Sequence, residues 1–247
     1  FAISAYYLWG FLPLYMKMLS HVGPVEVVAH RVIWSVPVAG LLLIVLRRTK
    51  DLMEALRTPR MFAMGCVTAA LISVNWGIYV WAITSGQALD AALGYYINPL
   101  FSVALGARLL REKLTGAQRV AIGLAGAAVA VLTISAGAIP WAAIGLTESW
   151  GLYALAKNQL SIGTNQGFLL EVLILLIPAV VYLIRLCVYG QGLFLVGDAS
   201  TDWLLLGCGA VTAIPLILYA NGAKRLRLST IAILQYIAPT MIFLTAV

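Results

Sequence analysis

Long apolar stretches fill almost the whole chain, and they limit more than any other feature how it can fold. Nine of them, each about 20 residues long, alternate with short connections. They cover residues 1–20, 25–46, 61–85, 91–110, 115–135, 140–157, 166–186, 202–222 and 228–247. A helix that crosses a bilayer takes about 20 mainly apolar residues. We therefore predict an all-α polytopic membrane protein whose connections leave no room for a soluble domain.

The composition excludes two other classes of protein. Only 10% of the 247 residues are charged and 62% are hydrophobic, whereas an ordinary soluble domain has roughly 25% charged residues. A soluble protein cannot keep that much apolar surface away from water. A disordered chain is polar and highly charged, so disorder is excluded as well.

The net charge of +7 raises the question of whether the chain binds nucleic acid. Suppose that the first helix starts in the cytoplasm. The loops after the second, fourth, sixth and eighth spans then hold 13 of the 16 Lys and Arg residues, and the outer ends hold only Lys17 and Arg185. Basic residues collect in the cytoplasmic loops of membrane proteins. The charge therefore predicts a multi-pass protein of the cell inner membrane with a cytoplasmic N-terminus, and no nucleic-acid partner.

The two halves of the chain share a weak internal repeat. A shift of 140 or 141 residues aligns Tyr96–Pro99 with Tyr236–Pro239, Tyr79 with Tyr219, and Trp9 with Trp150. We expect a first repeat at 1–137 with helices one to five and a second at 138–247 with helices six to nine. Because five is odd, the second copy lies inverted in the membrane. Inverted repeats are typical of transporters whose substrate site lies near the bilayer midplane, between the halves.

Several segments carry a resemblance to a known family. They are Ala29–Ser35 (AHRVIWS), Asn75–Ala82 (NWGIYVWA), Leu93–Leu100 (LGYYINPL), Leu228–Thr230 (LST) and Leu234–Thr240 (LQYIAPT). They resemble the RarD-type branch of the drug/metabolite transporter superfamily, which is built from EamA-type domains. The resemblance implies ten helices in two inverted five-helix repeats with both termini cytoplasmic. It also implies export of amino acids and other metabolites, and some members are linked to drug sensitivity.

Against that ten-helix pattern, this chain covers nine helices. Phe1 already lies in an apolar run, so we expect the chain to begin inside its first helix and to stop before a tenth. Gly123 and Gly126 lie four residues or fewer apart in the fifth span, and we interpret them as a surface for close helix packing.

Polar and aromatic residues at membrane depth are the candidate substrate-binding residues. An unpaired amide in hydrocarbon is costly, so such a side chain must face protein or a wet cavity. The candidates are Trp9, His30, Asn75, Trp76, Tyr79, Tyr95, Asn98, Trp150, Tyr219 and Gln235. A hydrogen bond between helices is an equal alternative for the amides, and a structural tie between helices is one for His30.

Three prolines and three charged residues within the spans are further candidates. Pro13, Pro99 and Pro239 each remove a helical hydrogen bond, so they can kink a helix or free a carbonyl group for a substrate. We expect Glu148 to bind a proton or an ammonium group, or to form a buried ion pair with Arg31. Glu171 is expected at the membrane interface.

These features predict an exporter of amino acids, aromatic and other neutral ones included, that works by alternating access between the two repeats. A drug or nucleotide-sugar carrier on the same fold is the alternative. A membrane enzyme or a scaffold is disfavoured, because the sequence has no Ser-His-Asp set, metal-ligand spacing or phosphate-binding loop and almost no soluble loop. We expect no cofactor and no metal. The expected partners are a small-molecule substrate and the lipid bilayer, with the chain a monomer or a homodimer.

Overall fold

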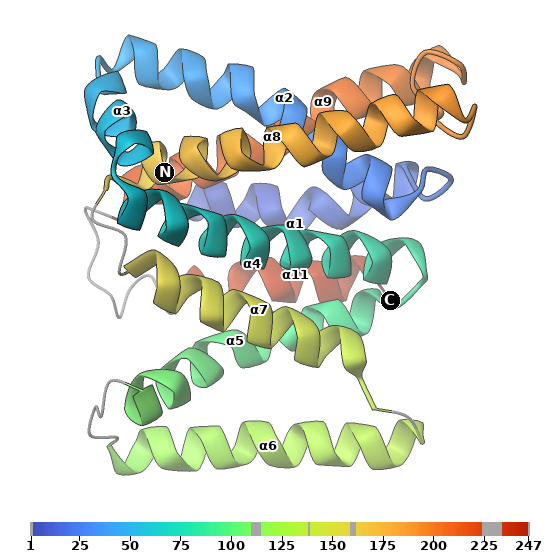
Figure 1. Cartoon of the computed structure of the whole chain (residues 1–247). Coiled ribbons are helices and arrows are strands. Elements are labelled where there is room, and N and C mark those ends of the chain that lie inside the picture. Colours follow the sequence, from blue (N-terminus) through green and yellow to red (C-terminus); the bar gives the residue numbers. More distant parts are fainter. Residues whose placement is uncertain (1, 110–114, 138, 159–161, 224–233, 247) are drawn as a thin grey trace.

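The computed structural model describes residues 2–109, 115–137, 139–158, 162–223 and 234–246. Within these ranges the chain is helical and contains no strand (Figure 1). The helices are α1 (Ala2–Met18), α2 (Pro24–Val45), α3 (Thr49–Arg57), α4 (Pro59–Thr84), α5 (Ala88–Leu109), α6 (Gly116–Ala136), α7 (Trp141–Asn158), α8 (Thr164–Val188), α9 (Ala199–Ala223) and α11 (Ile237–Ala246). The basic residues at 111, 113 and 224–227 and the start of the ninth span lie outside the described residues.

Four stretches of described helix are long and apolar enough to cross a membrane by length and composition. They are α2, α4, α8 and residues 199–219 of α9. The predicted all-α polytopic membrane protein is therefore confirmed. The other long helices run alongside these four, and α1 begins and α11 ends at opposite ends of the bundle (Figure 1). The count of nine spans stays a prediction.

The connection after α2 differs from the expected basic loop, because α3 forms within it. Leu52 and Ala55 of α3 are buried, and the helix packs on α4 and α8. Its charged residues Lys50, Asp51 and Arg57 are exposed. The sequence 47–60 thus forms a short amphipathic helix at one end of the bundle, since two apolar side chains three residues apart share one helix face.

The helices pair across the two halves of the chain. α1 packs on α9 and α11, and α7 packs on α4 and α5. In the same way, α2 packs on α9 and α8 packs on α4, while α2 and α8 pack on each other. The centre of the bundle is therefore built from helices that are distant in sequence.

Two glycines allow the closest of these pairings. A Cβ at Gly94 would lie 2.9 Å from the carbonyl oxygen of Ala143, so α5 and α7 are in backbone contact there. A Cβ at Gly151 would lie 2.6 Å from the ring of Phe101. The predicted packing role of Gly123 and Gly126 is wrong, because a Cβ at either glycine would meet no atom within 4 Å.

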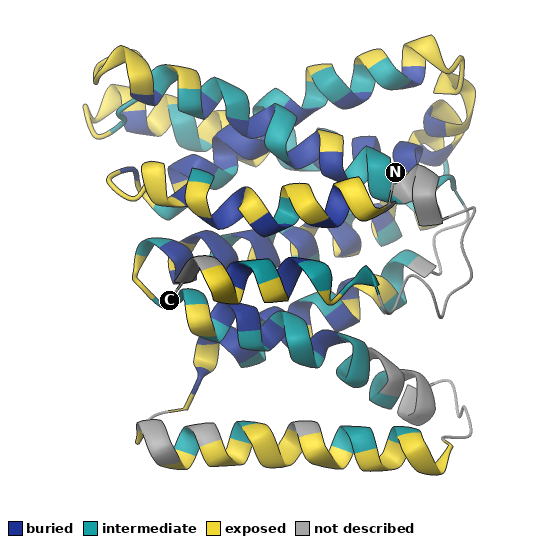
Figure 2. Cartoon of the chain, turned by 180° about the vertical axis from the view of Figure 1, so that it is seen from behind, coloured by how far each residue is buried: buried dark blue, intermediate teal, exposed yellow. Residues whose placement is uncertain are grey.

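α6 lies at the edge of the bundle and packs on α5 (Figure 1). Most of its described surface is exposed (Figure 2). Its apolar side chains Val120, Leu124 and Ile134 are 64%, 66% and 81% exposed. In a bilayer such side chains face hydrocarbon, which explains why two glycines on this helix meet no neighbour.

Candidate functional site

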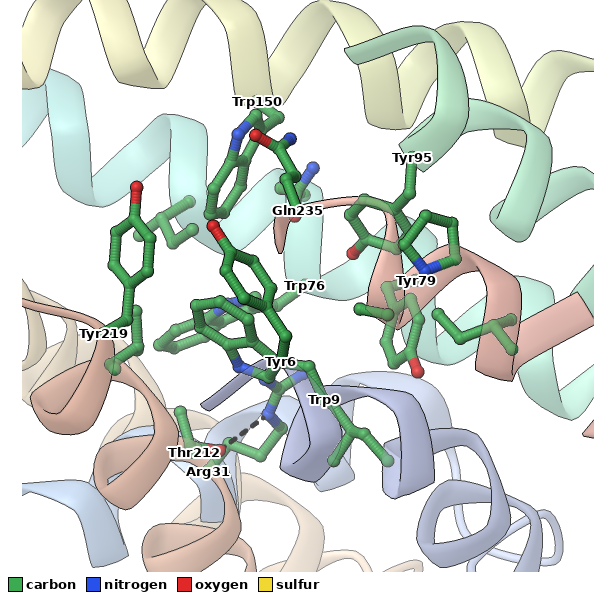
Figure 3. Close-up of a pocket in the computed structure, with 17 residues that line it drawn as sticks. Tyr6, Trp9, Arg31, Trp76, Tyr79, Tyr95, Trp150, Thr212, Tyr219 and Gln235 are labelled. Atoms are coloured by element: carbon green, nitrogen blue, oxygen red, sulfur yellow. Dashed lines mark hydrogen bonds between the residues drawn. The ribbon is translucent and has the colours of Figure 1, made fainter. Parts of the chain in front are cut away.

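A cavity lies in the middle of the bundle, between α1, α2, α4, α5, α7, α9 and the α11 segment (Figure 3). Its empty space is about 870 Å³, including the part that is open to solvent. The wall is mainly aromatic and aliphatic, with a few polar groups, as is typical of small-molecule sites. Both halves of the chain contribute to it.

Ten of the residues singled out from the sequence line this cavity. They are Trp9, Arg31, Asn75, Trp76, Tyr79, Tyr95, Trp150, Tyr219, Gln235 and Pro239. They come from seven segments, and the fold brings them together because each is an aromatic or polar residue on the inward face of its helix.

The aromatic wall consists of two groups of rings on different helices. Tyr6 and Trp9 of α1 lie 5.6 Å apart between ring centroids, and Trp9 lies 5.5 Å from Tyr219 of α9. Tyr79 of α4 lies 5.9 Å from Tyr95 of α5. Tilted and edge-on rings at these separations attract one another and present flat apolar surfaces to a ligand.

Arg31 is the charged residue of the cavity wall. Its side chain is 3% exposed, and its Nε donates a hydrogen bond to Thr212 Oγ1 at 3.0 Å (Figure 3). The guanidinium carbon lies 4.6 Å from the centre of the Trp76 ring. Nη1 has no hydrogen-bond partner among the described residues. The guanidinium is therefore held by a hydroxyl and an aromatic face and is not neutralised by a carboxylate.

Asn75 fulfils both roles that the sequence left open. It lines the cavity, and its Nδ2 donates to the Leu146 carbonyl at 3.1 Å and to Ser149 Oγ at 2.9 Å, which ties α4 to α7. Both amide hydrogens are thus used between helices. The oxygen Oδ1 is the atom that remains for a ligand, and it can only accept hydrogen bonds.

His30 and Asn98 do not line the cavity. His30 Nδ1 accepts a hydrogen bond from Trp34 Nε1 at 3.0 Å, and its ring lies 4.7 Å from that of Phe194. His30 is therefore the structural tie that was its alternative. Asn98 is buried elsewhere on α5, and neither atom of its amide has a partner in the described part of the chain.

The expected ion pair between Glu148 and Arg31 is wrong. Glu148 is exposed and borders a separate, shallow groove with Phe101 and Val129. Positions in two helices can be buried without facing each other, and sequence alone does not show which faces meet.

Glu171 is also not where it was expected. It is 1% exposed, its Oε1 pairs with Lys157 Nζ at 2.5 Å, and its Oε2 accepts from the Tyr153 hydroxyl at 3.2 Å. This is the ion pair that the described residues contain. It joins α7 to α8 outside the cavity, so burial of Glu171 is compensated by a cation and a hydroxyl.

The prolines lie in three different settings. Pro13 and Pro99 lie inside α1 and α5, which continue past them. Pro239 lies in the first turn of α11, where the backbone N–H groups need no intrahelical partner. Residues 235 and 236 form a turn directly before it, so the chain changes course beside the cavity.

The sequence did not single out seven residues of the wall. They are Tyr6, Leu12, Ile72, Thr212, Leu216, Ala238 and Ile242. Two of them carried a signal: Tyr6 lies three residues before Trp9, and Thr212 lies seven before Tyr219, so each shares a helix face with a candidate. The aliphatic residues had none, because an apolar side chain in a spanning helix looks the same in a cavity wall and in the core.

Comparison with known proteins agrees with a transport fold. Residues 1–134 match the model of the EamA-like transporter family. The chain is 41% identical to Protein RarD of Streptomyces exfoliatus over 98% of this chain and 77% of that protein. It is 39% identical to an uncharacterized transporter of Vibrio cholerae and 36% identical to Protein RarD of Escherichia coli, in each case over 100% of this chain and 82% or 83% of the relative. No solved structure matches.

Proposed function

Because this chain belongs to the EamA-like transporter family, we propose that it exports amino acids and similar small zwitterionic metabolites across the inner membrane. The observation that carries the proposal is the central cavity, which combines aromatic rings with amide and hydroxyl groups in the interior of the helix bundle. A polar cavity in a helix bundle of this family is expected to hold the transported molecule.

The wall offers a partner for each part of an amino acid. The rings of Tyr6, Trp9 and Tyr219 suit an apolar or aromatic side chain, because stacking and burial favour flat surfaces. Asn75 Oδ1 suits the ammonium group, since the amide nitrogen is already bonded to α7. Arg31 suits the carboxylate.

Alternating access supplies the mechanism, with the two halves exchanging their arrangement. The helix pairings support it. If α1, α2, α4 and α5 correspond to α7, α8, α9 and α11, the pairs α1–α9 and α1–α11 become α7–α4 and α7–α5, and all four are present. The pair α2–α9 becomes α8–α4, which is also present. Two halves that pack on each other reciprocally have a second arrangement of similar energy, which opens the cavity to the other side.

The test is transport by the purified chain in liposomes with a panel of amino acids at two pH gradients. We expect uptake of aromatic and other neutral amino acids above that of protein-free liposomes, and its response to the pH gradient reports proton coupling. A chain that moves no amino acid of the panel, although it is folded and inserted, would contradict the proposal.

A further inference from the structure

The hydrogen-bonding groups of the cavity are unevenly distributed. Arg31 Nη1 and the Tyr79 hydroxyl are buried wall groups without a hydrogen-bond partner among the described residues. Arg31 Nη1 can only donate, and the hydroxyl is free to donate. A buried donor without a partner loses its hydration and receives nothing in return. The two groups together therefore call for a ligand that accepts hydrogen bonds.

The charge of the cavity is also uncompensated. None of the 17 wall residues is acidic. Of the nine acidic residues of the sequence, all but Glu112 lie in the described ranges. Those that are engaged bind elsewhere: Glu171 binds Lys157, Asp51 binds Gln166, and Glu26 binds a backbone N–H of the segment after α8. A buried cation without an anion is costly, so the missing charge is expected to arrive with the ligand.

The guanidinium of Arg31 is fixed before any ligand arrives. Thr212 holds Nε, and the Trp76 ring covers the guanidinium plane. The Nη1 edge is what remains. An arginine edge with parallel N–H groups matches the two oxygens of a carboxylate, and pre-orientation lowers the entropy lost on binding.

We propose that Arg31 is the carboxylate-binding residue of this cavity, and that the carboxylate is the group by which the transporter selects its substrates, whereas the ammonium group is dispensable. The inference rests on the proposed function and deepens it. The substrate class becomes small monocarboxylates with an aromatic or apolar body, of which amino acids are one part. Amines and amides of the same shape are excluded, because they bring no negative charge to Arg31.

The experiment measures ligand-dependent thermal stabilisation of the full chain in lipid nanodiscs with four indole probes. A ligand that binds the folded state raises the unfolding temperature in proportion to its occupancy. Tryptophan has both charges, indole-3-propionate has only the carboxylate, and tryptamine and tryptophanamide lack it. We expect the two carboxylates to bind with dissociation constants within about fivefold of each other, and the amine and the amide to bind roughly tenfold or more weakly.

The variants Arg31→Gln and Arg31→Lys test the residue itself. We expect Arg31→Gln to reduce the preference for indole-3-propionate over tryptamine at least about tenfold, and Arg31→Lys to keep part of it, because a lysine is a point charge without the fork. Arg185→Gln is the matched control, since Arg185 is exposed near the end of α8. It should leave the preference unchanged.

The outcomes separate the two proposals. If tryptamine binds the wild-type chain as well as indole-3-propionate does, the inference is overturned, whether or not amino acids are transported and whether or not Arg31→Gln folds. If indole-3-propionate binds but no amino acid crosses the liposome membrane, the inference stands and the proposed amino acid export fails.

Discussion

Glu26 and Gln166 stand 140 residues apart, and each ties the first turns of its helix to the segment that follows the other's helix. Glu26 of α2 accepts a hydrogen bond at 2.9 Å from the backbone N–H of Leu193, which lies after α8. Gln166 of α8 donates at 3.0 Å to Asp51 of α3, which lies after α2. The two ties lie at opposite ends of the bundle (Figure 1). Each is therefore placed to hold one end of the structure closed.

The first prediction concerns these ties. Gln166→Leu removes the tie to α3, and Glu26→Gln weakens the tie to Leu193. Loss of one hydrogen bond, about 1 kcal/mol, shifts an open–closed equilibrium roughly fivefold. Labelling of a Leu216→Cys reporter by an impermeant maleimide, applied from either side of proteoliposomes, should rise with Gln166→Leu from one side and with Glu26→Gln from the other. Gln191→Leu, at an exposed position, is the control, and equal rates from both sides in all variants would contradict the prediction.

The second prediction concerns the aromatic wall. Tyr79→Ala and Trp150→Ala each remove a ring from the cavity, so transport should fall about tenfold or more while expression stays at the wild-type level. Trp203→Ala is the matched control, because Trp203 is 74% exposed outside the cavity. Uptake assays in liposomes compare the three. Unchanged transport in Tyr79→Ala and Trp150→Ala would place these rings in the packing of the helices instead.

The third prediction concerns the buried pair of Lys157 and Glu171. Glu171→Gln leaves a buried ammonium without its partner, and breaking such a pair typically costs about 3–5 kcal/mol. The double variant Lys157→Met with Glu171→Leu removes both charges and should be more stable than either single variant. Thermal unfolding in detergent gives the order of the four proteins. A double variant that is no more stable than the single ones would show that the pair is not coupled in this way.

The fourth prediction uses two glycines as a matched pair. Gly94→Ala puts a methyl group 2.9 Å from the Ala143 carbonyl oxygen, so α5 and α7 must move apart, at a cost of about 1–3 kcal/mol. Gly123→Ala meets no atom within 4 Å, and alanine is the better helix former. The unfolding temperature should therefore fall for Gly94→Ala and hold or rise for Gly123→Ala. The reverse order would mean that α5 and α7 pack less closely than described.

The sequence predicted what depends on a single helix better than what depends on two. The helical membrane class followed from apolar length, and most of the cavity wall followed from aromatic and amide residues at membrane depth. The partner of Arg31 did not follow, because Glu148 and Arg31 are both within spans but their faces do not meet. Glu171 was misplaced for the same reason: only the packing of α7 on α8 shows that Lys157 reaches it.

His30 and Arg31 show the limit most sharply, since they are neighbours in one helix. A helix turns by about 100° per residue, so one side chain faces Trp34 and Phe194 while the next lines the cavity. Both are polar and both are buried. The choice between them depends on the rotation of α2 about its own axis, which is set by its contacts with α8 and α9.

The lone positive charge of Arg31 has an electrical consequence. A charge that moves relative to the two faces of a membrane feels the transmembrane potential, at about 2.3 kcal/mol per elementary charge per 100 mV for a full crossing. A carrier loaded with a simple monocarboxylate is neutral at this position and turns without regard to voltage, whereas the same carrier loaded with a zwitterion stays positive, as does the empty one. Membrane voltage would then act on every turn of the cycle for an amino acid and only on the return for an organic acid, so that the same protein is electrically silent toward one cargo and current-carrying toward another.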